Sequence, residues 1–224
     1  VNAAGGTFSE KDILVDGSTT DNDVLNATLI DAVKANLTNI ETLKLNLAAQ
    51  GAGLNFEGIT GAKTVEISGT QDGVLSNVAA KAPEVTLTGG YNKTLTVAFK
   101  TLAGTSASDP ETLKVNLNGA GSNAKVQINI VGTDSTKNGS LEQLIINSAG
   151  TAANTLTVGT TDYDGTGSSD TSYASANGIA KFTVTGDQAL TLKVGHATIS
   201  TKTVENTGTG ALTLDIDRGT ATSQ

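Results

Sequence analysis

Residues Glu41–Leu47 read E-T-L-K-L-N-L, and Pro110–Leu117 repeats them almost unchanged as P-E-T-L-K-V-N-L. In both stretches apolar and polar residues alternate with a period of two, which is typical of a β-strand with one buried face. Shorter versions of this stretch recur along the chain: Lys63–Ser68, Pro83–Thr88, Leu141–Asn147, Lys181–Thr185 and Lys202–Glu205. A second strand-like run follows each of them: Gly53–Phe56, Gly73–Ser76, Lys93–Phe99, Ala124–Ile130, Asn154–Val158, Ala189–Val194 and Ala211–Ile216. The sequence therefore predicts a series of strand pairs.

The spacing of these pairs favours a parallel β-solenoid. Leu43, Val65 and Val85 occupy equivalent positions about 20 residues apart, an interval at which solenoid repeats are found. A unit this small must stack on its neighbours to bury its apolar face. The first strands continue the series, with longer intervals that predict surface loops, at Leu113, Leu144, Phe182 and Val204. In the second strands the equivalent positions are Leu54, Leu75 and Leu95.

A β-sandwich with hairpin connections is the alternative fold, because strands 8–12 residues apart also fit it. Repetition of one paired motif is not expected of a sandwich, and no N-G or D-G turn falls regularly between the pairs. We therefore expect an all-β, solenoid-like stack of two-strand repeats, with loop insertions in its C-terminal half.

The domain organisation predicted from these patterns is simple. Residues 1–11 form a linker or edge segment, residues 12–217 a single elongated β-repeat domain, and residues 218–224 a tail. Within the repeat domain, Leu29, Ile30, Val33 and Leu37 fall near helical spacing. Asp31–Asn39 is accordingly expected to form one or two helical turns or a loop.

Three asparagines fall near equivalent points of the repeat, namely Asn46, Asn116 and Asn147. They could stack their side-chain amides in a ladder. The interpretation preferred here is that asparagine is tolerated in the turn after each strand.

Composition limits both the core and the partners. Hydrophobic residues make up 37% of the 224 residues and aromatic residues only 3%, so Val, Leu, Ile and Ala must build the core. A net charge of −8 argues against nucleic acid and against anionic membrane surfaces, which need Lys and Arg. No apolar run reaches the roughly 20 residues needed to span a bilayer, so membrane insertion is not expected.

The chain contains no cysteine, which removes disulfides, CxxC zinc sites and thiol catalysis. Together with its acidity and its richness in Thr, Asn and Gly, this indicates an extracellular protein. The first residue is Val1 rather than Met, which suggests a processed chain or a segment of a longer one.

Candidate catalytic residues are scarce. The single histidine, His196, follows a strand and has no serine or carboxylate motif beside it. No nucleophile elbow, phosphate-binding glycine loop or H-E-x-x-H helix occurs. We therefore predict that the protein is not an enzyme.

Two acidic loops are candidate calcium sites, because calcium prefers six to eight oxygen ligands and glycine lets a loop bend round the ion. The first, Asp16–Asp23, carries Asp16, Asp21 and Asp23. The second, Asp162–Asp170, reads D-Y-D-G-T-G-S-S-D and carries Asp162, Asp164 and Asp170. The alternative for each is an acidic loop that water alone solvates.

Several phrases resemble those of a known family. They are Asn22–Leu29 (N-D-V-L-N-A-T-L), Asn39–Asn46 (N-I-E-T-L-K-L-N) and the glycine-spaced stretch Gly53–Gly69. The chain resembles bacterial surface-layer proteins, more narrowly the calcium-dependent, type I-secreted, RTX-related kind of Gram-negative bacteria. Asn22–Leu25 matches the N-D-x-L core of the RTX nonapeptide, although the glycines of that nonapeptide are absent.

The resemblance implies a secreted, non-enzymatic component of the cell surface that self-assembles into a lattice with the support of calcium. Its partners would be neighbouring copies of itself and cell-surface polysaccharide. The alternative is an adhesin or glycan-binding passenger domain of a large exoprotein. Sugars would then stack on exposed aromatic side chains, for which Tyr91, Tyr163 and Tyr173 are available.

Overall fold

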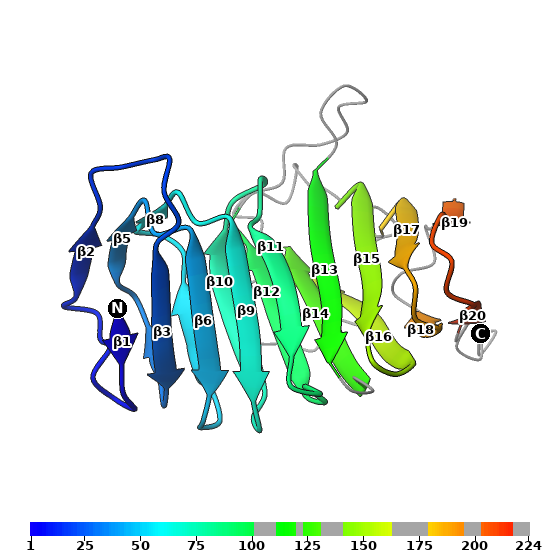
Figure 1. The fold of residues 1–224 in the computed structure, drawn as a ribbon, viewed down its shortest axis with the longest axis horizontal. Coiled ribbons are helices and arrows are strands. Elements are labelled where there is room, and N and C mark those ends of the chain that lie inside the picture. Colours follow the sequence, from blue (N-terminus) through cyan, green and yellow to red (C-terminus); the bar gives the residue numbers. More distant parts are fainter. Residues whose placement is uncertain (101–110, 120–122, 131–140, 163–178, 195–202, 217–224) are drawn as a thin grey trace, which may run out of the picture.

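The computed structural model shows an all-β chain that winds as a parallel β-solenoid (Figure 1). The residues that the structure describes are 1–100, 111–119, 123–130, 141–162, 179–194 and 203–216. Their strands form three sheets, and all the paired strands run parallel. The predicted solenoid is thereby confirmed, since the hairpins of a sandwich would pair strands antiparallel.

The largest sheet, here the front sheet, has nine strands among the described residues. In spatial order they are β1 (Asn2–Ala3), β3 (Val24–Leu29), β6 (Thr42–Leu47), β9 (Thr64–Gly69), β11 (Glu84–Thr88), β13 (Thr112–Gly119), β15 (Gln143–Gly150), β17 (Lys181–Gly186) and β19 (Thr203–Asn206).

The rear sheet has eight strands in the described part of the chain. They are β4 (Ala32–Val33), β7 (Gly53–Asn55), β10 (Gly73–Val78), β12 (Thr94–Phe99), β14 (Asn123–Ile130), β16 (Asn154–Asp162), β18 (Leu190–Val194) and β20 (Leu212–Ile216). A third sheet, at the N-terminal end only, consists of β2 (Ile13–Val15), β5 (Asn36–Thr38) and β8 (Ile59–Thr60).

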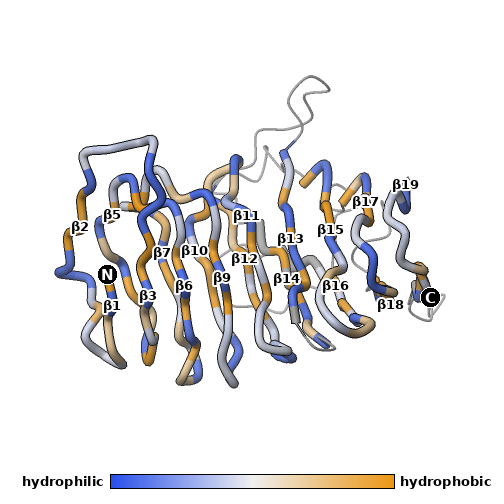
Figure 2. Tube along the Cα trace, viewed as in Figure 1, coloured by the Kyte–Doolittle hydropathy of each residue, from blue (hydrophilic) through white to orange (hydrophobic). Residues whose placement is uncertain are grey.

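Alternating side chains build the core between the sheets. On β6 the leucines 43, 45 and 47 are buried, whereas Lys44 and Asn46 are exposed. Hydrophobic and hydrophilic positions alternate in the same way along the other strands (Figure 2). One continuous apolar cluster results, and its aromatic members Phe8, Tyr91, Phe99 and Phe182 are at most 5% exposed.

Each coil runs from the front sheet to the rear sheet through a short connection of two to five residues. The return to the front sheet is where the coils differ. In the first coil without a third-sheet strand it comprises residues 79–83, between β10 and β11. In later coils it comprises residues 100–111, 131–142, 163–180 and 195–202. The lengthened repeat intervals therefore all fall between a rear strand and the next front strand.

The expected helix or loop at Asp31–Asn39 is wrong. This segment holds two short strands of different sheets, β4 and β5. Leu29, Val33 and Leu37 are all buried. The chain turns a corner after Leu29 and again after Val33, so the three residues lie on three different strands, β3, β4 and β5. Apolar residues spaced by four thus mimic a helical stripe, while Ile30 at a corner is 53% exposed.

Two predicted equivalences are wrong by two residues. Val85 pairs with Val115 and not with the predicted Leu113. Leu75 pairs with Val97 and not with the predicted Leu95, which pairs with Gly73. The equivalence of Leu113, Leu144, Phe182 and Val204 is confirmed. A shift of two leaves a side chain on the same face of a strand, so alternation alone does not detect it.

The three asparagines lie within strands and not in turns, which contradicts the preferred interpretation. Asn116 pairs with Asn147, but Asn46 pairs with Ser68 and belongs to another row. The row through Asn116 is mixed, because Thr86 precedes it and Thr185 follows Asn147. Asn116 Nδ2 donates to Thr86 Oγ1 at 3.2 Å, and Thr185 Oγ1 donates to Asn147 Oδ1 at 3.4 Å.

Candidate metal site

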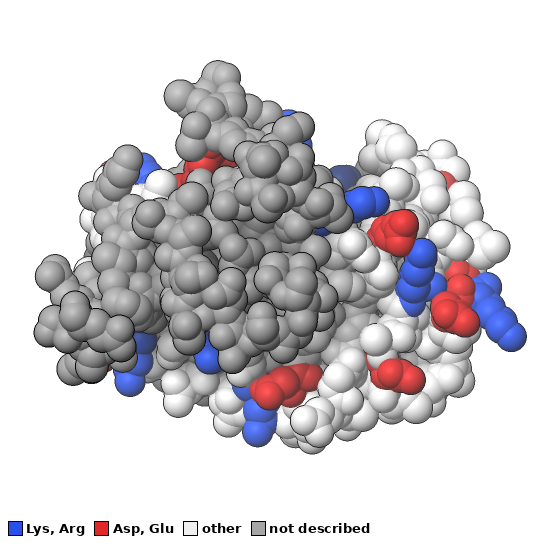
Figure 3. Space-filling view, turned by 180° about the vertical axis from the view of Figure 1, so that it is seen from behind, with Lys and Arg blue, Asp and Glu red and all other residues white. Residues whose placement is uncertain are grey.

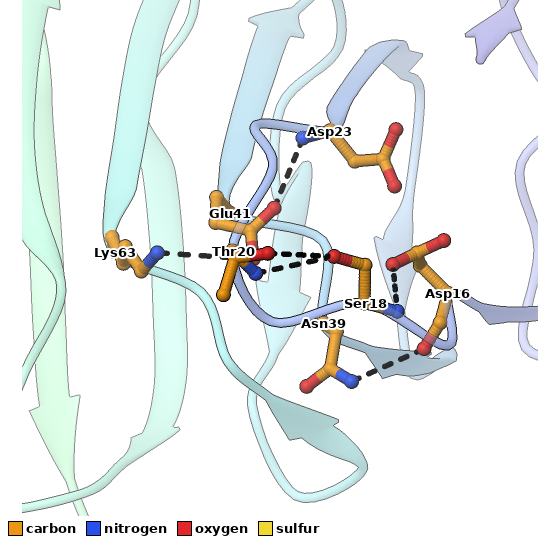
Figure 4. Close-up of polar contacts among 7 residues, drawn as sticks. All are labelled: Asp16, Ser18, Thr20, Asp23, Asn39, Glu41 and Lys63. Carbon is orange, nitrogen blue, oxygen red and sulfur yellow. Dashed lines mark hydrogen bonds and ion pairs between the residues drawn. The ribbon is translucent and has the colours of Figure 1, made fainter.

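The first predicted acidic loop connects the third sheet to the front sheet. Asp16 directly follows β2, and Asp23 directly precedes β3. Asp16 accepts a hydrogen bond from the backbone N–H of Ser18, an Asx-turn that bends the chain back at Gly17. Ser18 Oγ and Thr20 Oγ1 lie 3.4 Å apart at the centre of the loop (Figure 4).

Both ends of the loop are held by the next coil. At the first end, the backbone N–H of Asp16 donates to the carbonyl of Thr38 at 3.0 Å, and Asn39 Nδ2 donates to the carbonyl of Asp16 at 3.1 Å. At the second end, the backbone N–H of Asp23 donates to Glu41 Oε2 at 3.0 Å. These bonds fix the backbone at Asp16 and Asp23, the residues at the two ends of the loop.

The structure brings the three predicted aspartates together. Carboxylate oxygens of Asp16, Asp21 and Asp23 all lie within 4.8 Å of one another. Asp16 and Asp23 are half-buried and Asp21 is exposed. In Figure 4 the carboxylates of Asp16 and Asp23 lie on the same side of the loop, and Glu41 lies on the other.

This crowding perturbs the protonation of Asp23. Its pKa is raised above the ordinary value of an aspartate, first by desolvation and then by the negative charges of Asp16, Asp21 and Glu41. Like charges this close disfavour one another's ionised form. A cation at the cluster would relieve the same repulsion.

The donor set fits a hard divalent cation. Three carboxylates would supply three of the six to eight oxygens that calcium takes, and water would supply others. No histidine or cysteine lies among these ligands, so the site does not favour zinc or copper. Bound calcium would join the two ends of the loop by neutralising their charges.

The remaining predicted ligands fall in the second loop. Asp162 is the last residue of β16, where its backbone pairs with Ile130. Asp164 and Asp170 lie outside the described residues, as do His196, Tyr163 and Tyr173.

Tyr91 was expected as an exposed aromatic side chain, and this is wrong. It is 1% exposed, and its hydroxyl lies 3.0 Å from the carbonyl oxygen of Gln71. Tyr91 is therefore part of the core and offers no surface for a sugar.

The buried Glu41 was not recognised from the sequence as part of the site. It is 3% exposed, and its second oxygen lies 3.9 Å from Lys63 Nζ. The sequence does contain a signal for Glu41, because a glutamate, Glu142, occupies the same position directly before the front strand of a later repeat. Glu142 Oε2 likewise accepts the backbone N–H of Glu111, in the preceding coil, at 2.9 Å.

The described surface carries charges of both signs. Seen from behind, Lys side chains lie among Asp and Glu side chains over the described residues, and neither sign forms a continuous patch there (Figure 3). Many of the charges are paired between neighbouring coils, as in Lys44–Glu66 at 3.1 Å and Lys114–Glu84 at 2.7 Å.

Comparison with known proteins gives no match: no family model fits the chain, and no curated protein or solved structure is significantly similar to it. Within the described ranges, no helix has the length and apolar character needed to cross a membrane.

Proposed function

We propose that this chain is a non-enzymatic building block of a bacterial cell-surface layer, which is extracellular and self-assembles into a lattice with the support of calcium. The observation that carries the proposal is the pair of long parallel sheets, nine and eight strands wide, that run from one end of the described chain to the other. The first and last described strands, β1 and β20, lie at opposite ends of this stack (Figure 1).

A solenoid of this kind suits a structural role. Its coils are joined by backbone hydrogen bonds throughout and by ion pairs on the outer faces, which favours a stiff body of fixed length. Polar side chains of neighbouring coils form hydrogen bonds with one another, as Asn116 does with Thr86. The most deeply buried carboxylate of the described residues, Glu41, accepts the backbone N–H of Asp23. These features support a scaffold.

Calcium has a specific place in this proposal. With a net charge of −8, copies of the chain repel one another, and a divalent cation at the acidic loop lowers that repulsion. Asp16, Asp21 and Asp23 are the residues proposed to hold it.

The test is assembly and thermal unfolding of chelator-stripped protein with and without millimolar calcium, with magnesium as the ionic control. At one hundred times its dissociation constant, calcium stabilises the fold by about 2.7 kcal/mol. For a chain of this size we expect a Tm higher by about 5–10 °C. Particles should form at the same calcium concentrations, as seen by light scattering and electron microscopy.

A matched pair of variants assigns the effect to the loop. Asp16→Asn/Asp21→Asn/Asp23→Asn should abolish the calcium response. Glu10→Gln/Asp187→Asn/Asp215→Asn changes net charge equally at other exposed acidic positions and should retain it. A calcium response of equal size in both triple variants would show that the loop is not the site, and assembly unaffected by excess chelator would refute a role for calcium.

A further inference from the structure

The third sheet ends abruptly, and a cleft lies where it stops. Beyond β8 the chain crosses directly from the rear to the front sheet through residues 79–83. The cleft has a volume of about 440 Å³, and its lining includes Phe56, Ile59, Ala79, Ala80 and Lys100. Phe56 and Ile59 are only half-buried, so the cleft presents apolar surface.

One edge of β8 faces no strand of the described chain. The backbone N–H groups of Leu37 and Asn39 donate to the carbonyls of Gly58 and Thr60, each at 3.0 Å, so those carbonyls face β5. Because the direction of backbone groups alternates along a strand, the carbonyl of Ile59 faces the opposite way. The N–H of Ile59 donates to the carbonyl of Phe56 at 3.1 Å, so the edge offers an added strand the carbonyl of Ile59 as an acceptor.

The cleft is also locally positive in an acidic protein. Glu57 is bound by Lys34 at 2.8 Å, and the charge of Lys100 also lowers the pKa of Glu57, so two cations face one carboxylate. An occupant that is both apolar and acidic would therefore complement it.

The opposite edge of the same sheet has these properties. On β2, Ile13 and Val15 are each 68% exposed, and Asp12 and Asp16 flank the strand. The backbone groups of Asp12 and Asp16 bond to β5, which leaves those of Ile13 and Val15 directed away from the sheet. Ile13 and Val15 are thus exposed both at the side chain and at the backbone.

We propose that β2 of a second copy of this chain docks along β8 and fills the cleft. This inference rests on the proposed self-assembly and names its contact. Antiparallel addition turns the second molecule over, so its body lies away from the coils of the first. The outward side chains Ile13 and Val15 then face Ala79 and Ala80, and Asp12, which is not among the proposed calcium ligands, approaches Lys100.

The contact uses two different surfaces and is therefore heterologous. Each copy keeps one unused β2 and one unused cleft, so the assembly grows as an open chain. This property makes the proposal testable by mixing variants.

The experiment is sedimentation velocity of the whole chain under the conditions in which the wild type assembles. Ile13→Thr/Val15→Thr keeps β-branched residues in β2 but removes the apolar contact, and Ala79→Glu blocks the cleft. We expect each variant to remain at the monomer mass of 22.5 kDa, with association weakened at least tenfold. The control Val74→Thr alters an exposed valine of the rear sheet, 37% exposed, and should assemble as the wild type does.

Mixing the two blocked variants provides the decisive result. One retains an intact cleft and the other an intact β2, so the mixture should form dimers and nothing larger. Lys100→Glu should weaken assembly, whereas Lys93→Glu, an equal charge change outside the cleft, should not. Circular dichroism confirms that each variant is folded.

The outcomes separate this contact from the broader function. If the wild type assembles and the blocked variants assemble equally well, the β2–β8 contact is wrong while self-assembly stands. If the mixture remains monomeric although each variant is folded, the contact is also wrong. A wild type that stays monomeric with and without calcium overturns the proposed function itself.

Discussion

The N-terminal and C-terminal parts of this solenoid solve the same packing problem differently. Near the N-terminus three sheets surround the core, and the front strands β6 and β9 are six residues long. Beyond β8 only two sheets remain among the described residues. In the middle of this two-sheet part β13, β14 and β15 lengthen to eight residues and β16 to nine, whereas β11 has five and β17 six. The longer strands therefore widen the core at these coils only.

The return to the front sheet shows which part of a coil is fixed. Its length varies from coil to coil, yet in three of the described coils it ends in a buried apolar residue two positions before the front strand. Ile40 takes this position before β6, Leu141 before β15 and Ile179 before β17, and they are 6%, 0% and 0% exposed. A connection can therefore lengthen freely as long as its last turn closes the core.

Core truncations test this comparison most strongly. Phe182→Ala in the two-sheet part should cost about 3–5 kcal/mol of unfolding free energy. Leu37→Ala in the third sheet should cost about 2–3 kcal/mol, because its strand neighbours Leu14 and Ile59 are only partly buried and can close in. Urea unfolding measures both, with the outward-facing Thr157→Ala as a control near zero. A larger cost at Leu37 would contradict the view that the third sheet is the less constrained side.

Glycines at the ends of front strands should act alike in both parts. Gly69 and Gly186 have φ of +120° and +98°, and a Cβ atom would meet the carbonyl oxygens of Leu47 and Ser148 respectively. Alanine at either position should destabilise the fold by about 1–3 kcal/mol. Gly159→Ala, which meets nothing within 4 Å, should be neutral or slightly stabilising. Thermal unfolding of the three variants checks whether the same turn is needed with two sheets and with three.

The two glutamates that accept a backbone N–H should contribute more to stability than the Lys63–Glu41 ion pair does. Glu41→Ala leaves the backbone N–H of Asp23 without its acceptor and should cost about 1–3 kcal/mol, and Glu142→Ala should behave similarly at Glu111. Lys63→Ala should cost less than about 1 kcal/mol, because Lys63 is 61% exposed and 3.9 Å away. If Lys63→Ala cost as much as Glu41→Ala, charge pairing and not backbone bonding would be the main role of Glu41.

The smallest effect concerns pH. The pKa of Asp23 is raised, so the folded state binds a proton more tightly than the unfolded state does, and calcium-free protein gains stability as pH falls through that pKa towards about 4. Asp23→Asn should raise the Tm at pH 7, and this advantage should disappear at low pH. An advantage that persists unchanged at pH 4 would show that charge repulsion is not its cause.

Glu84 on the front sheet should show the opposite trend. Desolvation acts to raise its pKa, but hydrogen bonds from Lys114 and Asn116 and the charge of Lys114 outweigh it, and the pKa is lowered. Its contribution is therefore present above the ordinary glutamate value and lost as pH falls through the lowered pKa. Melts of Glu84→Gln across the same pH range measure this difference.

The positions of the strands were determined by the sequence. Alternation marks where a strand lies and which face it buries, and the repeated E-T-L-K-L-N-L phrase implies stacking, so the parallel solenoid could be predicted. The aspartates of the first loop could also be named, since three carboxylates within eight residues are brought close by any tight loop.

Only the tertiary structure decided how the coils align. Alternation is unchanged by a shift of two residues, so the pairing of Val85 with Val115 and of Leu75 with Val97 depends on the packing of whole sheets. The third sheet was not visible either, because its two- and three-residue strands turn a corner before any period can be established. The anchoring of the acidic loop by Glu41 and Asn39 likewise exists only once the next coil lies against it, since neither residue is near the loop in the sequence.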